Sequence, residues 1–249
     1  MSIKTNIPVK SLTYNGEPVE ISYEGYVSKE EVDLLMAKND ISGHYENDWL
    51  TIARQDLFID NTTVTSVYMP NITILNGAGG AFNACTALET INLPKLTSAG
   101  RGFCQGATAL KNVYLPLLKS LGNGYFRNCT SLKKVVFESV TSTGSTDIFS
   151  GTCGVEVADF YVLDTLAYGG LKNSANLHTL IIRTPTVCKS TYANPLSGTP
   201  IADGEGFIYV PDNLVEAYKI QTNLNVYANQ YKPLSELPEE IKLWLEQNF

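Results

Sequence analysis

The sequence has no cluster of basic residues and no long apolar run. It contains 18 Lys and Arg against 25 Asp and Glu, a formal net charge of −7, and its longest basic run is Lys133-Lys134. Phosphate neutralisation needs clustered Lys and Arg, so we expect no nucleic-acid partner. No apolar stretch approaches the ~20 residues of a membrane helix, so we expect no membrane insertion.

The first residues lack the apolar segment of a secretory signal. Residues 1–8 read MSIKTNIP and contain no apolar h-region. We therefore expect either that a signal has been removed or that the protein is made and used without one, as phage structural proteins are.

The residue types that carry catalysis and metal binding are scarce. Only His44 and His178 are histidines, and the nucleophile motif GxSxG does not occur. The glycines of residues 77–80 lack the Lys-Ser/Thr of a phosphate loop, so we interpret them as a corner of the chain. The five cysteines lack the spacing of a zinc site, and we predict small buried apolar side chains at Cys85, Cys104, Cys129, Cys153 and Cys188. We expect no catalytic residue, no metal and no cofactor.

A unit of 22 to 24 residues recurs through the middle of the chain. Aligned on proline, three copies read Val67-Tyr68-Met69-Pro70, Ile91-Asn92-Leu93-Pro94 and Val113-Tyr114-Leu115-Pro116, and a fourth, Val135-Val136-Phe137-Glu138, lacks the proline. Glycine and phenylalanine follow each copy, with the phenylalanines at Phe82, Phe103, Phe126 and Phe149. Small-residue turns such as Cys129-Thr130-Ser131-Leu132 then end the unit. Several positions recurring in phase indicate a repeat architecture.

Each unit predicts one coil of a solenoid: a short strand, a corner, a return segment whose phenylalanine enters the core, and a second corner. One coil cannot bury its own apolar side, so coils must stack, with strands paired in parallel about 4.8 Å apart. The predicted fold is a leucine-rich-repeat-type right-handed coil with a parallel β-sheet on one face and short helical caps at both ends. Cys85 and Cys129, two coils or about 10 Å apart, should not form a disulfide.

The pattern continues more loosely toward the C-terminus, through Phe160-Tyr161-Val162, Leu180-Ile181-Ile182 and Ile208-Tyr209-Val210-Pro211. We divide the chain into an N-terminal cap or attachment region (1–60), a solenoid of about seven coils (61–211) and a C-terminal helical cap (212–249).

The caps are predicted from helix signals. Ser28-Lys29-Glu30-Glu31 is a capping box for an N-terminal helix. Near the C-terminus, Asp212 is the predicted N-cap of a helix through Tyr218. A last helix is expected to begin at Pro238, with one apolar face formed by Ile241, Trp244 and Leu245.

The unit Leu-x-x-[Ile/Val]-x-Leu-Pro-x-Leu-x-Ser, followed by Gly-x-x-Phe and Cys-Thr-Ser-Leu, resembles the BspA-like leucine-rich repeats of bacteria. The resemblance covers about residues 60–185, with a degenerate unit at 157–177 and no proline after Phe137. The segments 208–218 and 231–237 look like the closing module of such proteins in Gram-positive gut bacteria and their phages. The resemblance implies surface adhesion or host recognition and brings no catalytic residue.

Alternation of side chains predicts one outward-facing row along the sheet. Its members are Tyr68, Asn92, Tyr114, Val136, Tyr161, Ile181 and Tyr209. A polar row should frame it, at Ser66, Thr90, Asn112, Lys134, Asp159 and Thr179. Four stacked tyrosines would suit the binding of a protein or glycan surface, because an aromatic ring offers contact area at low entropic cost. Two alternatives are that tyrosine is present for its strand preference, or that a terminal segment covers the row.

These observations favour a binding protein over an enzyme. The first hypothesis is a phage virion component, in the tail or baseplate, that contacts virion partner proteins and recognises a host. The second is a bacterial cell-surface adhesin, and the third a glycan-active enzyme, which would need two carboxylates about 5 to 9.5 Å apart in one groove. Virion components are commonly symmetric oligomers, so a homotrimer is one expected assembly.

Overall fold

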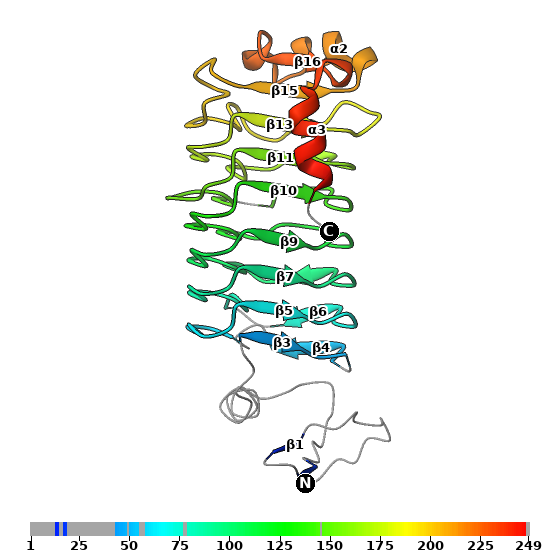
Figure 1. Cartoon of the computed structure of the whole chain (residues 1–249). Coiled ribbons are helices and arrows are strands. Elements are labelled where there is room, and N and C mark those ends of the chain that lie inside the picture. Colours follow the sequence, from blue (N-terminus) through cyan, green and yellow to red (C-terminus); the bar gives the residue numbers. More distant parts are fainter. Residues whose placement is uncertain are drawn as a thin grey trace.

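The chain winds into an elongated stack of coils (Figure 1). The computed structural model describes residues 13–14, 17–18, 43–48, 50–54, 58–76, 79–144 and 146–247. At the N-terminal end, β1 (Thr13–Tyr14) pairs antiparallel with β2 (Glu17–Pro18). The predicted capping box at Ser28 lies outside the described residues.

One long face of the stack, the main face, carries one strand per coil. Four strands form a parallel sheet: β3 (His44–Glu46), β5 (Ser66–Tyr68), β7 (Thr90–Asn92) and β9 (Asn112–Tyr114). A five-stranded parallel sheet continues the face with β10 (Lys134–Phe137), β11 (Val157–Phe160), β13 (Thr179–Ile182), β15 (Phe207–Val210) and β16 (Tyr231–Pro233). The predicted parallel solenoid is thereby confirmed, with Ile91 directly opposite Val113.

Shorter strands form a second face where each coil returns. β4 (Ile52–Arg54), β6 (Ile74–Asn76) and β8 (Ser98–Ala99) form one parallel sheet, and β12 (Thr165–Leu166) pairs in parallel with β14 (Lys189–Ser190). Isolated parallel bridges join Ser120 to Ser142 and Ser142 to Thr165. The coils therefore stay in register on both faces.

The stack begins earlier than the predicted boundary at residue 61. Tyr45 in β3 lies opposite Val67, and Ala53 in β4 lies opposite Leu75, so the segment 43–60 contains a coil of its own. Asp48 occupies the position that Pro70 holds in the next coil, which is why the repeat pattern does not reveal this coil. At the other end, β16 extends the main face past residue 211.

Aromatic side chains form a continuous file through the core. Ring centroids of Tyr45 and Phe58 lie 4.9 Å apart, those of Phe58 and Phe82 5.3 Å, and those of Phe82 and Phe103 5.3 Å. The file continues through Tyr125, Phe126, Phe137 and Phe160. All four phenylalanines predicted to fill the core are buried, so neighbouring coils share one apolar interior.

A glycine permits the close stacking of two corners. A Cβ added to Gly80 would lie 1.7 Å from the carbonyl oxygen of Gly102 in the next coil. Any side chain at residue 80 would therefore force the two coils apart.

Short helices close the C-terminal end of the stack. They are η1 (Asp212–Leu214), α2 (Val215–Ile220), η2 (Asn225–Tyr227) and η3 (Leu234–Glu236). The prediction of Asp212 as an N-cap is wrong: Pro211 holds the N-cap position of η1, and the Asp212 carboxylate accepts a hydrogen bond from the Ser235 amide at 3.0 Å. Inside the cap, the buried Tyr218 hydroxyl accepts a hydrogen bond from the Cys188 amide at 2.8 Å.

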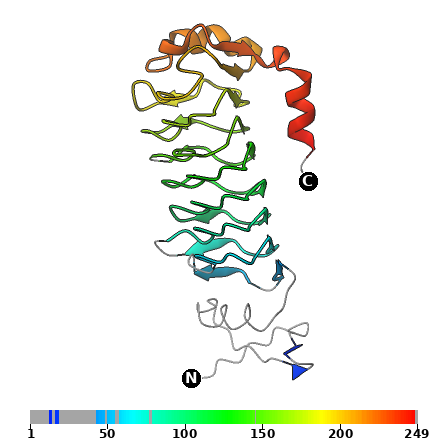
Figure 2. The same ribbon diagram turned by 60° about the vertical axis from the view of Figure 1, so that its left-hand side comes forward.

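The last helix, α3 (Glu239–Glu246), follows Pro238 as predicted but does not close the end of the stack. It runs back along the outside of the main face, from the level of β15 to that of β10 (Figures 1 and 2). Ile241, Trp244 and Leu245 pack against Val157, Ile181 and Tyr209 as a small cluster separate from the main core. The helix is therefore a cover for half of this face.

Candidate binding surface

Strand register within each sheet defines the central outward row of the main face, and the repeat aligns Tyr114 with Val136 across the break between β9 and β10. The described members of the row are Glu46, Tyr68, Asn92, Tyr114, Val136, Asp159, Ile181, Tyr209 and Lys232. Six of the seven predicted residues lie in this row, and Tyr161 does not.

The predicted position of Tyr161 is wrong by two residues. Asp159 pairs with Val136 and Ile181, so the central position of this coil belongs to Asp159. Tyr161 lies two residues farther along the same face. The predicted framing row shifts likewise, because Val157, and not Asp159, lies opposite Lys134 and Thr179.

Helix α3 divides the row into a covered and an uncovered half. Ile181 and Tyr209 are 0% and 6% exposed, so the prediction that they are available for contact is wrong. Thr179 and Lys134 of the framing row are also buried, and the Lys134 Nζ lies 5.1 Å from the centroid of the Trp244 ring. The continuous tyrosine ladder is therefore interrupted by a terminal segment of the chain.

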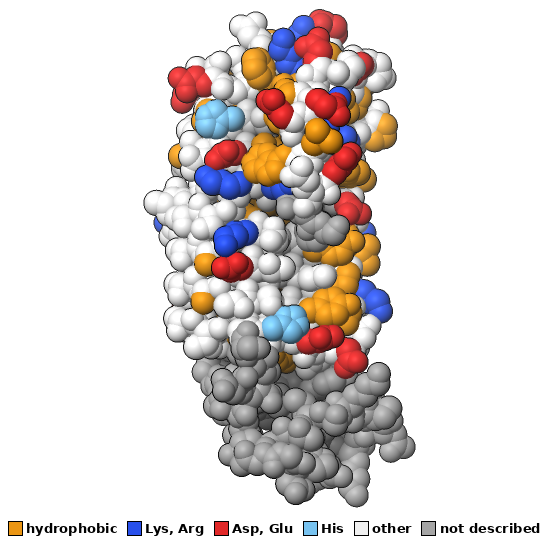
Figure 3. Space-filling model, viewed as in Figure 1, with side chains coloured by type: hydrophobic (Ala, Val, Ile, Leu, Met, Phe, Trp, Pro, Cys, Tyr) orange, Lys and Arg blue, Asp and Glu red, His pale blue; other side chains and the backbone are white. Residues whose placement is uncertain are grey.

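The uncovered half presents Tyr68, Asn92 and Tyr114 on three successive, hydrogen-bonded strands. Each of these side chains is partly exposed, and so are Ser66, Thr90 and Asn112 beside them. His44 Nδ1 lies 2.7 Å from Ser66 Oγ at the N-terminal end. Figure 3 shows blue and red side chains interspersed over this side of the molecule, without a field of one sign. The surface is polar and aromatic, which suits a neutral partner surface.

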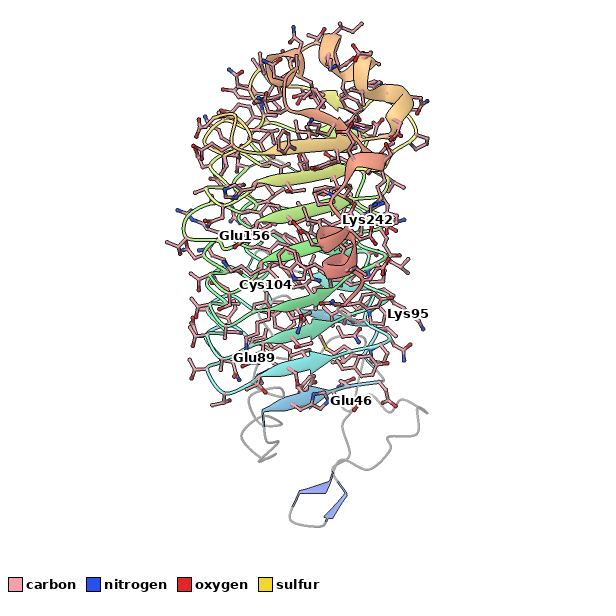
Figure 4. All side chains as sticks on the ribbon, turned by 45° about the horizontal axis from the view of Figure 1, so that its top comes forward. Glu46, Glu89, Lys95, Cys104, Glu156 and Lys242 are labelled. Atoms are coloured by element: carbon pink, nitrogen blue, oxygen red, sulfur yellow. The ribbon has the colours of Figure 1, made fainter. Side chains whose placement is uncertain are left out.

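A groove of about 360 Å³ lies where the uncovered half meets the C-terminal turn of α3. The sheet side supplies Tyr114, Leu115, Pro116, Val136, Glu138, Asp159, Tyr161 and Arg183, and the helix supplies Lys242, Leu245 and Glu246. Figure 4 shows Lys242 on α3 over the strands of the main face, with Glu46 on β3 at the far end of that face.

An ion pair between Asp159 and Arg183 lines the groove. Arg183 Nε donates to both carboxylate oxygens of Asp159, at 2.9 and 3.0 Å, and Nη2 donates to Oδ2 at 2.8 Å. The guanidinium carbon also lies 5.0 Å from the centroid of the Tyr161 ring. Asp159 is buried, whereas the Arg183 side chain is 31% exposed. Burial raises the pKa of Asp159 against the opposing effect of Arg183. The repeat pattern does not reveal Arg183, because the Asp159–Arg183 pair is not a recurring feature of the described coils.

Burial shifts the pKa of one amine and of several thiols in the described part of the chain. Burial lowers the pKa of Lys134 and raises the pKa of Cys85 to about 12 and of Cys153 to about 11. All five cysteines are buried and unpaired, as predicted, and a thiol with a raised pKa is a poor nucleophile. His178 is exposed, with Nδ1 2.7 Å from the carbonyl oxygen of Asn176.

The described residues contain neither a metal-binding group nor a membrane-spanning helix. No group of three or more His, Cys, Asp or Glu there is placed to hold a metal ion. No helix there is long and apolar enough to cross a bilayer.

Stacked coils, a parallel sheet on one face and a buried file of repeat phenylalanines define a leucine-rich-repeat solenoid. A model of the BspA type leucine-rich repeat region matches residues 51–183 in six copies, which is more than half of the chain. The protein belongs to this family, as its resemblance over residues 60–185 predicted. Such repeats are typical of binding or adhesion proteins at cell surfaces or outside cells, and the family is typically non-enzymatic. No curated protein matches the chain.

Proposed function

We propose that this protein is a non-enzymatic binding module whose contact surface is the uncovered half of the main face. The observation that carries the proposal is the register of Tyr68, Asn92 and Tyr114 on successive strands. Strand pairing fixes the backbone that carries these side chains. A partner that contacts this surface therefore orders few additional groups of the protein, which keeps the entropic cost of binding low. The partner is a protein or glycan surface.

The site of action that we favour is a phage virion, with a bacterial cell surface as the alternative. A phage tail or baseplate protein would bind the surface of bacterial cells, whereas an adhesin would bind cells or matrix outside its own bacterium. The experiment applies the labelled full chain to Gram-positive gut bacteria and to mammalian epithelial cells. Binding to bacteria favours the virion role, and binding to epithelial cells alone favours the adhesin role.

The contact surface is tested with the double variant Tyr68→Ser/Tyr114→Ser. We expect it to fold and to bind cells at least ~10-fold more weakly, as loss of central aromatic contacts does at other interfaces. The matched control is Tyr168→Ser, which removes an exposed tyrosine next to β12, away from the main face. Equal binding by wild type and the double variant would show that this surface is not used.

Self-association is a separate part of the proposal. Because the expected assembly is a trimer, the mass in solution should be three times the chain mass of 27.3 kDa. A monomeric mass by light scattering would remove the trimer from the proposal and leave the contact surface untouched.

A further inference from the structure

We propose that the groove between the main face and α3 binds a neutral oligosaccharide, an inference that rests on the proposed binding function and narrows its ligand class. The groove combines an exposed aromatic ring, a fixed guanidinium and carboxylates within one concave site. Sugars present both apolar C–H faces and hydroxyl groups that donate and accept hydrogen bonds, so they match all three.

The charges of the groove disfavour an anionic ligand. Its lining contains two cations, Arg183 and Lys242, and three anions, Glu138, Asp159 and Glu246. Asp159 neutralises Arg183, and Lys242 Nζ lies 3.3 Å from Glu239 Oε2. No positive charge is left in excess to attract a phosphate, carboxylate or sulfate group. A neutral polyhydroxyl ligand instead finds donors and acceptors close together.

The polar groups are held in place before a ligand arrives. Asp159 is 1% exposed and engages Arg183 through three hydrogen bonds, which leaves Nη1 without an acceptor among the described residues. Arg183 lies against the ring of Tyr161, which is 44% exposed. The free Nη1 donor of Arg183 and the ring of Tyr161 are therefore fixed relative to each other. Such preorganisation lowers the entropic cost of binding.

An extended peptide fits the groove less well than a saccharide. Peptides that bind sheets usually pair with a free strand edge through backbone hydrogen bonds. Strand β11 under this groove pairs with β10 and β13, whereas β9 and β10 are the neighbouring edges of the two sheets. A peptide could reach those two edges only by entering between stacked coils. On the outer side of the groove only side chains are offered to the ligand, which is the situation in which hydroxyl groups and a sugar ring are recognised.

The test is titration calorimetry of the full chain with maltotriose, cellotriose and chitotriose, each up to about 10 mM, a range that detects weak binding. We expect saturable binding of at least one of the three. Tyr161→Ala should raise its Kd at least ~10-fold, whereas Tyr161→Phe, which keeps the ring, should stay within ~3-fold of wild type. Trigalacturonate, an anionic counterpart, should bind more weakly than the neutral sugars. Tyr168→Ala, remote from the groove, is the matched control and should leave Kd unchanged.

Three results would overturn the inference: no saturable binding of any neutral trisaccharide, equal binding by Tyr161→Ala and wild type, or tighter binding of trigalacturonate. Failure here can be told apart from failure of the proposed function. Cell binding that is lost in Tyr68→Ser/Tyr114→Ser, together with no saturable binding of a neutral trisaccharide in calorimetry, would retain the contact surface and reject the saccharide site.

Discussion

The docking of α3 on the main face can be tested by removing its largest apolar side chain. Trp244 packs in the separate cluster with Val157, Ile181 and Tyr209, and it is only partly buried. A fully buried aromatic residue contributes about 3–5 kcal/mol, so the half-buried Trp244 should contribute about 2 kcal/mol. If docking loses about 2 kcal/mol, the fraction of molecules with α3 undocked increases about 30-fold.

The effect should stay local. An eight-residue helix is not stable alone in water, so α3 unfolds when it undocks. In Trp244→Ala we expect hydrogen-exchange protection of residues 239–246 to fall about 30-fold. The Tm of the solenoid should change by less than about 3 °C, because the cluster under α3 is separate from the main core.

A control on the same helix separates docking from helix propensity. Leu243→Ala changes a residue that is 49% exposed and lies outside the cluster, so protection should remain close to wild type. Unchanged protection in Trp244→Ala, or a fall in Tm of more than about 8 °C, would refute the description of α3 as an independently docked cover.

Three further variants test the buried polar groups and the core. Lys134→Met should strengthen α3 docking by about 1 kcal/mol, measured by exchange, because the buried Nζ has no hydrogen-bond partner in the described part of the chain. Burial lowers the pKa of Lys134, so wild-type docking should strengthen as pH rises from that lowered pKa toward the ordinary lysine value, and the variant should lose this dependence. Tyr125→Phe removes a buried hydroxyl without a described partner and should raise Tm by about 2–4 °C. Phe103→Ala should cost about 3–5 kcal/mol in denaturant unfolding, and a mild effect would contradict its place in the core.

The coils could be predicted because each one repeats the same physical requirements. Leu93 and Leu115 enter the core before a proline corner, and Phe103 and Phe126 return to it, so a fixed period appears in the sequence. The first coil could not be predicted from this period, because Phe58 occupies the core without the proline and glycine that accompany the other phenylalanines.

The exact frame of β11 could not be predicted from alternation alone. The run Val157-Ala158-Asp159-Phe160-Tyr161-Val162 contains apolar residues in both phases. Centring the strand on Tyr161 preserves the tyrosine ladder, but the structure places Phe160 opposite Phe137. That pairing stacks two core aromatic rings 5.1 Å apart. Core packing therefore decides the frame, and Asp159 emerges on the outer row beside Arg183.

The position of α3 lies beyond what a repeat pattern can reveal. Spacing of Ile241, Trp244 and Leu245 predicts an apolar face, yet two apolar surfaces are open to such a helix: the end of the stack and its main face. At the end, Tyr218, Leu224 and Tyr227 of the preceding segment already bury the apolar edge. The main face still presents Val157, Ile181 and Tyr209, whose apolar character contrasts with the polar Ser66, Thr90 and Asn92 farther along. Apolar burial thus directs the helix to the C-terminal half of the face and leaves the polar half uncovered.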